Sequence, residues 1–217
     1  MKTATLALLA VSVAVAAGCS NLPRSRDLGN PEVSGQTLAE QVCSNCHGVT
    51  GTATSPNFPN LAGQPEVYLS NQLHELKGHS RRDPAGFEYM WGISRRLTDR
   101  QIQEIAGYFS AQQLRAQPLE GNAAQIEGGR PIFNDGVPAK GIPPCHSCHG
   151  PQGMGNEKFP RLAGQHADYL VKQLTVFQRT DERPEGSIMK TVAHELTREN
   201  IVDVAAYLQA LPHDGTR

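Results

Sequence analysis

The stretch CSNCH at Cys43–His47 is matched by CHSCH at Cys145–His149, so the chain of 217 residues carries two Cys-x-x-Cys-His motifs. This motif is the form that attaches a c-type haem: its two thiols form thioethers with the vinyl groups, and the next histidine ligates the iron. The spacing is fixed because both sulfurs and the imidazole must reach one rigid macrocycle. The motifs predict two covalently bound haem c groups, with thioethers at Cys43, Cys46, Cys145 and Cys148 and with His47 and His149 as iron ligands.

Paired cysteines also build zinc sites and redox-active dithiols. The cysteine pairs of a four-thiolate zinc site usually lie much closer in sequence than Cys46 and Cys145 do. A thioredoxin-like pair needs a βαβ context, and no convincing strand pattern is present. Neither alternative explains the histidine after each pair, so haem attachment is the favoured interpretation.

The first residues are typical of an export signal. Met1–Gly18 has a positively charged start and a short apolar run ending in small residues, which is too short for a membrane span. Cys19 directly follows Gly18 and resembles the lipidated cysteine of a bacterial lipoprotein, with ordinary signal cleavage as the alternative. Residues 19–35 are polar and rich in Pro, Gly and Ser, which favours a flexible tether. The expected location is the bacterial periplasm, with a membrane anchor at Cys19.

The two halves of the chain resemble each other beyond the cysteine motifs. Phe58–Gln64 (FPNLAGQ) returns 101 positions later as Phe159–Gln165 (FPRLAGQ). Such self-similarity indicates an internal duplication. We expect an N-terminal domain at 36–113 and a C-terminal domain at 125–217, joined by a polar linker at 114–124.

Each unit has the periodicity of amphipathic helices. Apolar residues recur at i, i+3, i+4 and i+7 in Ile102–Phe109 and again in Ile201–Leu208. Thr98 with Gln101 resembles a capping box, and Thr197 is a candidate N-cap. Two further helices are expected, at Glu66–Leu76 and Ala167–Phe177. The predicted fold class is therefore all-α, and each haem is expected to supply much of its domain's small core.

Two methionines are candidates for the second axial ligand of each iron. Met90 and Met189 lie 43 and 40 residues after the two motif histidines, far enough for the chain to wrap a macrocycle. A lone methionine is ordinarily core filler, but the duplication keeps these two at equivalent positions. Histidine ligation of one haem is the alternative, because six histidines have no counterpart in the other unit: His74, His79, His146, His166, His194 and His213.

Histidine and methionine ligands together predict electron transfer. A thioether ligand favours ferrous iron, and filling both axial positions leaves none for a substrate. The chain is therefore expected to be a carrier and not an enzyme, without a small-molecule substrate.

Two prolines are expected to support the ligand histidines. A ligating imidazole needs an acceptor for its second N–H, which fixes its orientation and tunes its basicity. The carbonyls of Pro59 and Pro160, 12 and 11 residues after the motif histidines, suit that role. The alternative is that these prolines only stiffen the turn.

The two Cys-x-x-Cys-His-Gly segments, the two Pro-x-Leu-Ala-Gly-Gln turns and the Gly141–Cys145 run resemble the di-haem cytochrome c4 family over residues 35–212. The resemblance implies two tandem class I cytochrome c domains around a pseudo-twofold axis. It implies a periplasmic carrier whose partners are a terminal oxidase, a quinol-cytochrome c reductase or another periplasmic carrier. Alternatives are an electron-accepting subunit of a dehydrogenase complex and a di-haem peroxidase.

The charge pattern is informative locally and not overall. The whole chain has a formal charge of −1, which gives no sign of nucleic-acid binding. Residues 77–96 hold five basic and two acidic side chains, whereas 176–195 hold three basic and four acidic ones. We expect the positive segment, with Arg81 and Arg82, to dock an acidic redox partner. The alternative is that these arginines serve haem propionates or the domain interface.

Overall fold

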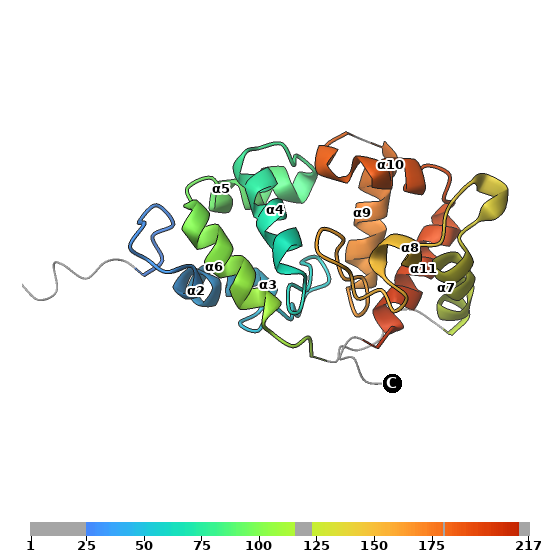
Figure 1. Cartoon of the computed structure of the whole chain (residues 1–217), viewed down its shortest axis with the longest axis horizontal. Helices are drawn as coiled ribbons and strands as arrows, with labels where there is room; N and C mark the ends of the chain where they lie inside the picture. The colour runs from blue at the N-terminus through green and yellow to red at the C-terminus, as the bar shows by residue number, and fades with distance from the viewer. Residues whose placement is uncertain (1–24, 116–122, 180, 213–217) are drawn as a thin grey trace, which may run out of the picture.

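The computed structural model describes residues 25–115, 123–179 and 181–212. Within these ranges the secondary structure is helical, with two isolated β-bridges and no strand, so the all-α prediction is confirmed. Figure 1 shows two lobes of similar size, formed by the two halves of the chain. The predicted signal segment and Cys19 lie outside the described residues.

The N-terminal domain contains five α-helices and two π-helical turns in its described part. Their order is α2 (Gly35–Leu38), η1 (Ala39–Cys43), α3 (Ser44–His47), α4 (Glu66–Lys77), η2 (Gly86–Met90), α5 (Trp91–Ser94) and α6 (Asp99–Ser110). The capping box of Thr98 and Gln101 is present at the start of α6. Both π-helical turns end at a predicted haem-binding residue, Cys43 or Met90.

The C-terminal domain follows the same plan with local differences. Its elements are α7 (Ala123–Asp135), η3 (Pro138–Lys140), α8 (His146–His149), α9 (Ala167–Arg179), η4 (Pro184–Gly186), α10 (Ser187–Ala193) and α11 (Arg198–Ala210). Thr197 caps α11 as expected, accepting from the backbone N–H of Asn200. Helix α7 begins at Ala123 with two strong helix formers, two residues before the predicted start of the C-terminal domain at 125.

Each domain has its own apolar core. The N-terminal core centres on the α6 side chains Ile102, Ile105 and Phe109, and the C-terminal core on Phe133 with the α11 side chains Ile201 and Val204. The apolar stripes seen in the sequence are therefore the buried faces of α6 and α11. The Met90 segment packs against α4, and α10, which carries Met189, packs against α9.

Candidate haem-binding sites

The cysteine motifs form single helical turns that end directly after the histidine. Gly48 and Gly150 follow these turns with φ angles of 75° and 82°. A Cβ atom on Gly48 would lie 2.3 Å from the carbonyl oxygen of Thr52, so a side chain is excluded there. The chain can thus leave the helix at once and fold back beneath the histidine.

The returning chain is the Pro-x-Leu-Ala-Gly-Gln turn, held by backbone hydrogen bonds. The carbonyl of Gly51 accepts from the N–H groups of Leu61 (2.7 Å) and Ala62 (3.0 Å). In the C-terminal domain the carbonyl of Gly153 accepts from Leu162 and Ala163 at the same two distances. The two turns therefore sit equivalently beneath their motifs.

This arrangement brings each motif histidine to a proline carbonyl. His47 Nδ1 lies 2.9 Å from the Pro59 oxygen, and His149 Nδ1 lies 2.9 Å from the Pro160 oxygen. Since a carbonyl can only accept, each Nδ1 carries the proton and Nε2 keeps its lone pair. The hydrogen bonds expected from the sequence are present in both domains, and Nε2 is the atom available to a metal.

Burial keeps both imidazoles in the neutral form that a metal requires. His47 and His149 are 7% and 6% exposed. Burial lowers the pKa of each imidazole, and the hydrogen bond to the proline carbonyl opposes only part of that effect. A neutral imidazole with a fixed tautomer is suited to ligate iron.

The first cysteine of each motif is half-buried, and its thiol is partly removed from water. Burial raises the pKa of Cys43 to about 12 and that of Cys145 to about 11. Redox-active dithiols have lowered thiol pKa values, so this environment disfavours thioredoxin-like chemistry. Within the described ranges no three His, Cys, Asp or Glu side chains converge as a metal-binding group.

The two candidate methionines are half-buried but lie in different local structure. Met90 ends the π-helical turn η2, and its carbonyl accepts a hydrogen bond of 2.7 Å from Ser94 Oγ. Met189 lies within α10 and packs against the C-terminal core. Their ligand roles remain predictions.

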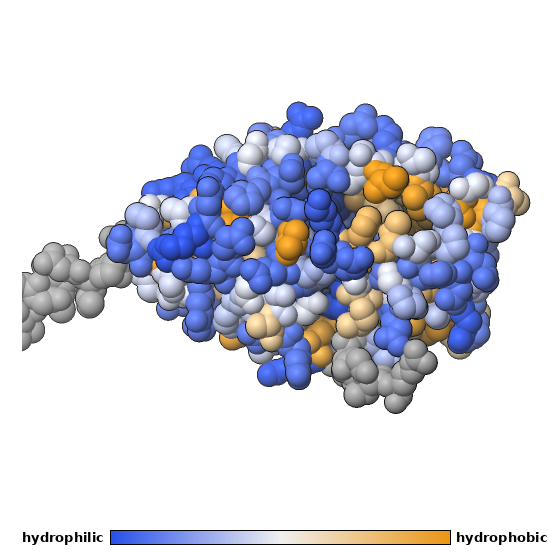
Figure 2. Space-filling model, in the orientation of Figure 1, coloured by the Kyte–Doolittle hydropathy of each residue, from blue (hydrophilic) through white to orange (hydrophobic). Residues whose placement is uncertain are grey.

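Exposed apolar side chains surround these residues, as a haem crevice requires. The exposed large hydrophobic residues are Val49, Val67, Phe87, Tyr89, Phe159 and Ile188. All but Val67 lie within three positions of a candidate histidine, methionine or proline. Figure 2 shows apolar side chains gathered beside α8, α9 and α10. Apolar surface of this kind fits a macrocycle, so the residues present fit a covalently held haem.

Several of the unmatched histidines have other partners. His166 is 3% exposed, and its Nε2 lies 3.0 Å from the Ala53 carbonyl of the other domain. His146 Nε2 lies 3.0 Å from the Asn134 carbonyl, and the ring of His79 stacks on Trp91 at 4.8 Å. His213 lies outside the described residues. These contacts favour interface and packing roles for His166, His146 and His79.

The two Pro-x-Leu-Ala-Gly-Gln turns, at 59–64 and 160–165, contact each other and form part of the domain interface. Gln165 Oε1 accepts from the backbone N–H of Asn60 at 2.8 Å, and Gln165 Nε2 donates to the Asn60 carbonyl at 3.0 Å. Gln64 makes the mirrored pair with the backbone of Arg161, at 2.9 and 2.8 Å. This exchange relates the domains by an approximate twofold axis between the turns.

Arg161 fills the space beside these contacts as a buried cation. It is 1% exposed, its Nη2 donates to the Ala62 carbonyl at 2.7 Å, and its Nη1 donates to Ala163. Among the described residues no carboxylate pairs with it, and burial lowers its pKa to about 10. Arg161 thus holds together the two turns that carry the proline carbonyls.

A second polar cluster at the interface corrects one expectation. Arg81 is 7% exposed: its Nε lies 2.7 Å from Asp83 Oδ1, and its Nη1 donates to Gln72 at 2.6 Å. Arg183 of the C-terminal domain also donates to Gln72, at 2.8 Å. Arg81 therefore belongs to the domain interface, and the prediction that it docks a partner was wrong.

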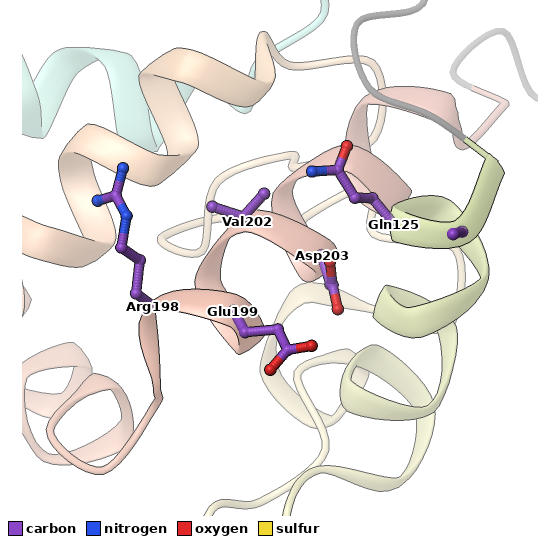
Figure 3. Close-up of a pocket in the computed structure, with 6 residues that line it drawn as sticks. Gln125, Arg198, Glu199, Val202 and Asp203 are labelled. Carbon is purple, nitrogen blue, oxygen red and sulfur yellow. The ribbon is translucent and has the colours of Figure 1, made fainter.

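One concavity of the described surface lies away from the candidate haem sites. It measures about 530 Å³ and is lined by residues of α7 and α11, including Gln125, Glu199 and Asp203 (Figure 3). None of the predicted site residues lines it. This polar groove is therefore no part of the candidate haem sites.

Sequence reasoning missed the roles of Gln64, Gln165 and Arg161. A signal was available for the glutamines, because both copies of the turn keep Leu-Ala-Gly-Gln while the residue after proline changes from Asn60 to Arg161. No such signal marked Arg161, since a lone arginine in a loop is ordinarily exposed.

Comparisons with known proteins agree with this geometry. The cytochrome c family model matches residues 33–113 and 129–212. Cytochrome c4 from Pseudomonas aeruginosa is 35% identical over 207 residues, covering 94% of this chain and 98% of that protein. A thiosulfate dehydrogenase electron acceptor from Thiomonas intermedia is 33% identical, covering 81% of each chain. The crystal structure of reduced cytochrome c4 from Pseudomonas stutzeri superimposes with a TM-score of 0.74 at 37% identity, covering 85% of this chain and all of that one.

Proposed function

The chain belongs to the cytochrome c4 family and binds two covalently attached haem c groups, and on that basis we propose that it carries single electrons between membrane respiratory complexes and a terminal oxidase in the periplasm. The observation that carries this proposal is the pair of equivalent sites, each with a buried neutral histidine held at 2.9 Å by a proline carbonyl. A haem in such a site supplies one-electron chemistry at its iron.

The site residues are assigned by role. In the N-terminal site Cys43 and Cys46 hold the haem, His47 and Met90 ligate the iron, and Pro59 orients the histidine. In the C-terminal site the same roles fall to Cys145, Cys148, His149, Met189 and Pro160. We infer domain limits of 36–113 and 125–217 around these sites, joined by the linker at 114–124, whose last two residues begin α7.

The protein's own side chains protect each site and leave its edge accessible. Buried histidines and apolar surroundings exclude water from the ligand side, and the exposed apolar side chains beside Met90 and Met189 are suited to contact a redox partner. Two filled axial positions leave no place for a substrate, so we propose a carrier and no enzymatic activity.

The location and anchoring rest on the sequence. The export signal at Met1–Gly18 supports the periplasm, and Cys19 supports attachment to the membrane through lipid. In the described ranges no helix has the length and apolar character needed to cross a membrane. Mass spectrometry of the mature N-terminus tests the anchor: a diacylated Cys19 is expected, and an unmodified residue at a later cleavage point would overturn it.

A second candidate function is favoured by one comparison. The relative from Thiomonas intermedia is named as an electron acceptor of thiosulfate dehydrogenase, and it aligns over both domains of this chain. The same ligand set would serve an electron-accepting subunit. Affinity purification of the chain at native levels separates the two functions: stable association with a larger catalytic subunit favours the acceptor, and recovery alone favours the free carrier.

The carrier function is tested by stopped-flow oxidation and reduction of the purified holoprotein. Both haems should exchange electrons with soluble redox proteins, and neither should bind carbon monoxide rapidly when reduced. Turnover of hydrogen peroxide by the purified protein would contradict the proposal and favour a peroxidase.

A further inference from the structure

The peptide group between Pro59 and Asn60 has two hydrogen-bond partners from different domains. Its carbonyl accepts from His47 Nδ1 at 2.9 Å, and its N–H donates to Gln165 Oε1 at 2.8 Å. Because both groups belong to one planar peptide, a change at the N–H alters the acceptor strength of the carbonyl. His47 is thus linked through a single peptide to a side chain of the C-terminal domain.

The C-terminal domain contains the mirrored arrangement. The peptide between Pro160 and Arg161 accepts from His149 Nδ1 at 2.9 Å and donates to Gln64 Oε1 at 2.9 Å. The Nε2 atom of Gln165 also donates to the Asn60 carbonyl, and the Nε2 atom of Gln64 donates to the Arg161 carbonyl. This second hydrogen bond fixes the orientation of each glutamine amide. Each domain therefore supplies the side chain that completes the other domain's histidine support.

Burial makes these links strong. Gln64 and Gln165 are each 3% exposed, while Asn60 and Arg161 are 0% and 1% exposed. Water cannot replace a lost hydrogen-bond partner at such buried positions. In surroundings of low polarity, hydrogen bonds linked in series also strengthen one another. The peptide N–H would be left unsatisfied if the glutamine were removed.

We propose that Gln165 and Gln64 are positioning residues that act across the domain boundary, Gln165 on His47 and Gln64 on His149. The inference rests on the proposed assignment of these histidines as iron ligands. Acceptance at the peptide N–H increases the negative charge on the proline carbonyl, which then draws the Nδ1 proton more strongly. The imidazole becomes a better electron donor, and this stabilises ferric iron and lowers the potential of the haem in the other domain.

This arrangement makes the two haem potentials depend on how the domains pack. A partner that shifts the domains relative to each other would loosen both glutamine contacts and raise both potentials together. An interface that served only to hold the domains would produce no such crossed effect.

The test is a redox titration of holoprotein carrying Gln165→Met, with each haem followed separately. The N-terminal haem is identified by adding Met90→His to one sample, which removes its sulfur-to-iron absorption band. The expected result is a rise in the midpoint potential of the N-terminal haem that exceeds any change at the C-terminal haem. Gln64→Met should give the mirrored result.

A second variant distinguishes an effect of Gln165 on the haem potential from a contribution of Gln165 to domain packing alone. Gln165→Glu keeps an acceptor for the Asn60 N–H, so the N-terminal potential should stay at or below the wild-type value. In reduced wild-type protein the His47 Nδ1 proton should resonate further downfield than in Gln165→Met. If the methionine variant does not fold, the glutamate variant and its His47 proton resonance carry the test.

Three results would overturn the inference: unchanged potentials, equal shifts of both haems, or a larger shift in the mutated domain. A potential that rises alike in the methionine and glutamate variants would also overturn it. Failure of the ligand assignment itself is distinguishable, because wild-type protein would then lack the two sulfur-to-iron bands before any variant is made.

Discussion

Arg81 Nε lies 2.7 Å from Asp83 Oδ1 inside the domain interface, and Asp83 is completely buried. Asp83 Oδ2 also lies 3.4 Å from Gln173 Nε2 of the other domain. Within the positive segment at 77–96, Arg81 therefore pairs with Asp83 between the two domains. A redox partner can reach only the basic side chains of this segment that are exposed.

Removing the charge of Asp83 is expected to weaken the protein. Asp83→Asn leaves the Arg81 guanidinium buried without its carboxylate, and breaking such a pair costs about 3 kcal/mol or more. Urea unfolding followed by circular dichroism measures this loss. Asp181→Asn is the matched control, because Asp181 pairs with Lys190 on the surface and should contribute little. Equal stability of the two variants would contradict the interface account.

Acid should open the domain interface through the same aspartate. Burial alone would raise the pKa of Asp83, but the guanidiniums of Arg81 and Arg183 outweigh burial, and the pKa lies below the ordinary 3.8. The folded state therefore favours the charged form, so this contribution is complete above pH 3.8 and is lost as pH falls through the lowered pKa. Unfolding free energies of wild type and Asp83→Asn should converge at low pH. A difference that stays constant with pH would contradict this prediction.

Met90→His should convert the N-terminal haem to two nitrogen ligands. We expect about half of the sulfur-to-ferric-haem absorption to disappear and the N-terminal midpoint potential to fall, because the thioether favours ferrous iron. Met154→His is the control: Met154 is half-buried, lies five residues after His149 and has no counterpart in the other domain. Loss of the sulfur-to-ferric-haem band in the Met154 variant would indicate that Met154, and not Met189, is the ligand of the C-terminal haem.

The exposed arginines near Met90 should steer anionic redox partners. Arg82 and Arg95 are exposed, and among the described residues neither has a carboxylate partner. Replacing both with glutamate should slow oxidation by ferricyanide by roughly an order of magnitude at low salt, and high salt should remove most of the difference. Lys172→Glu, at an exposed position of α9, is the control in the other domain. Equal slowing by the control would favour a general charge effect.

Features set by local chemistry could be predicted from the sequence. The duplication, the helix faces of α6 and α11 and the caps at Thr98 and Thr197 follow from repeated residues, apolar spacing and capping chemistry. The contact of Pro59 with His47 followed from the need of an imidazole N–H for an acceptor.

Features set by packing between distant segments could not be predicted. Charge counts gave no sign that Arg81 turns inward, since its burial depends on a partner domain that supplies Gln173 and Arg183. Helix α7 was not predicted, and it continues through Pro131, whose ring removes a helical hydrogen bond. The cross-domain glutamines are visible only once the two turns face each other.

The central claim is that both haems are closed electron carriers with histidine and methionine ligands. An absorption-monitored redox titration of the purified holoprotein, with and without carbon monoxide, tests it most directly. We expect two low-spin haems that both show the sulfur-to-ferric-haem band, titrate at positive potential and resist rapid binding of carbon monoxide. A high-spin haem, or one that binds carbon monoxide at once, would contradict the account and indicate a catalytic site.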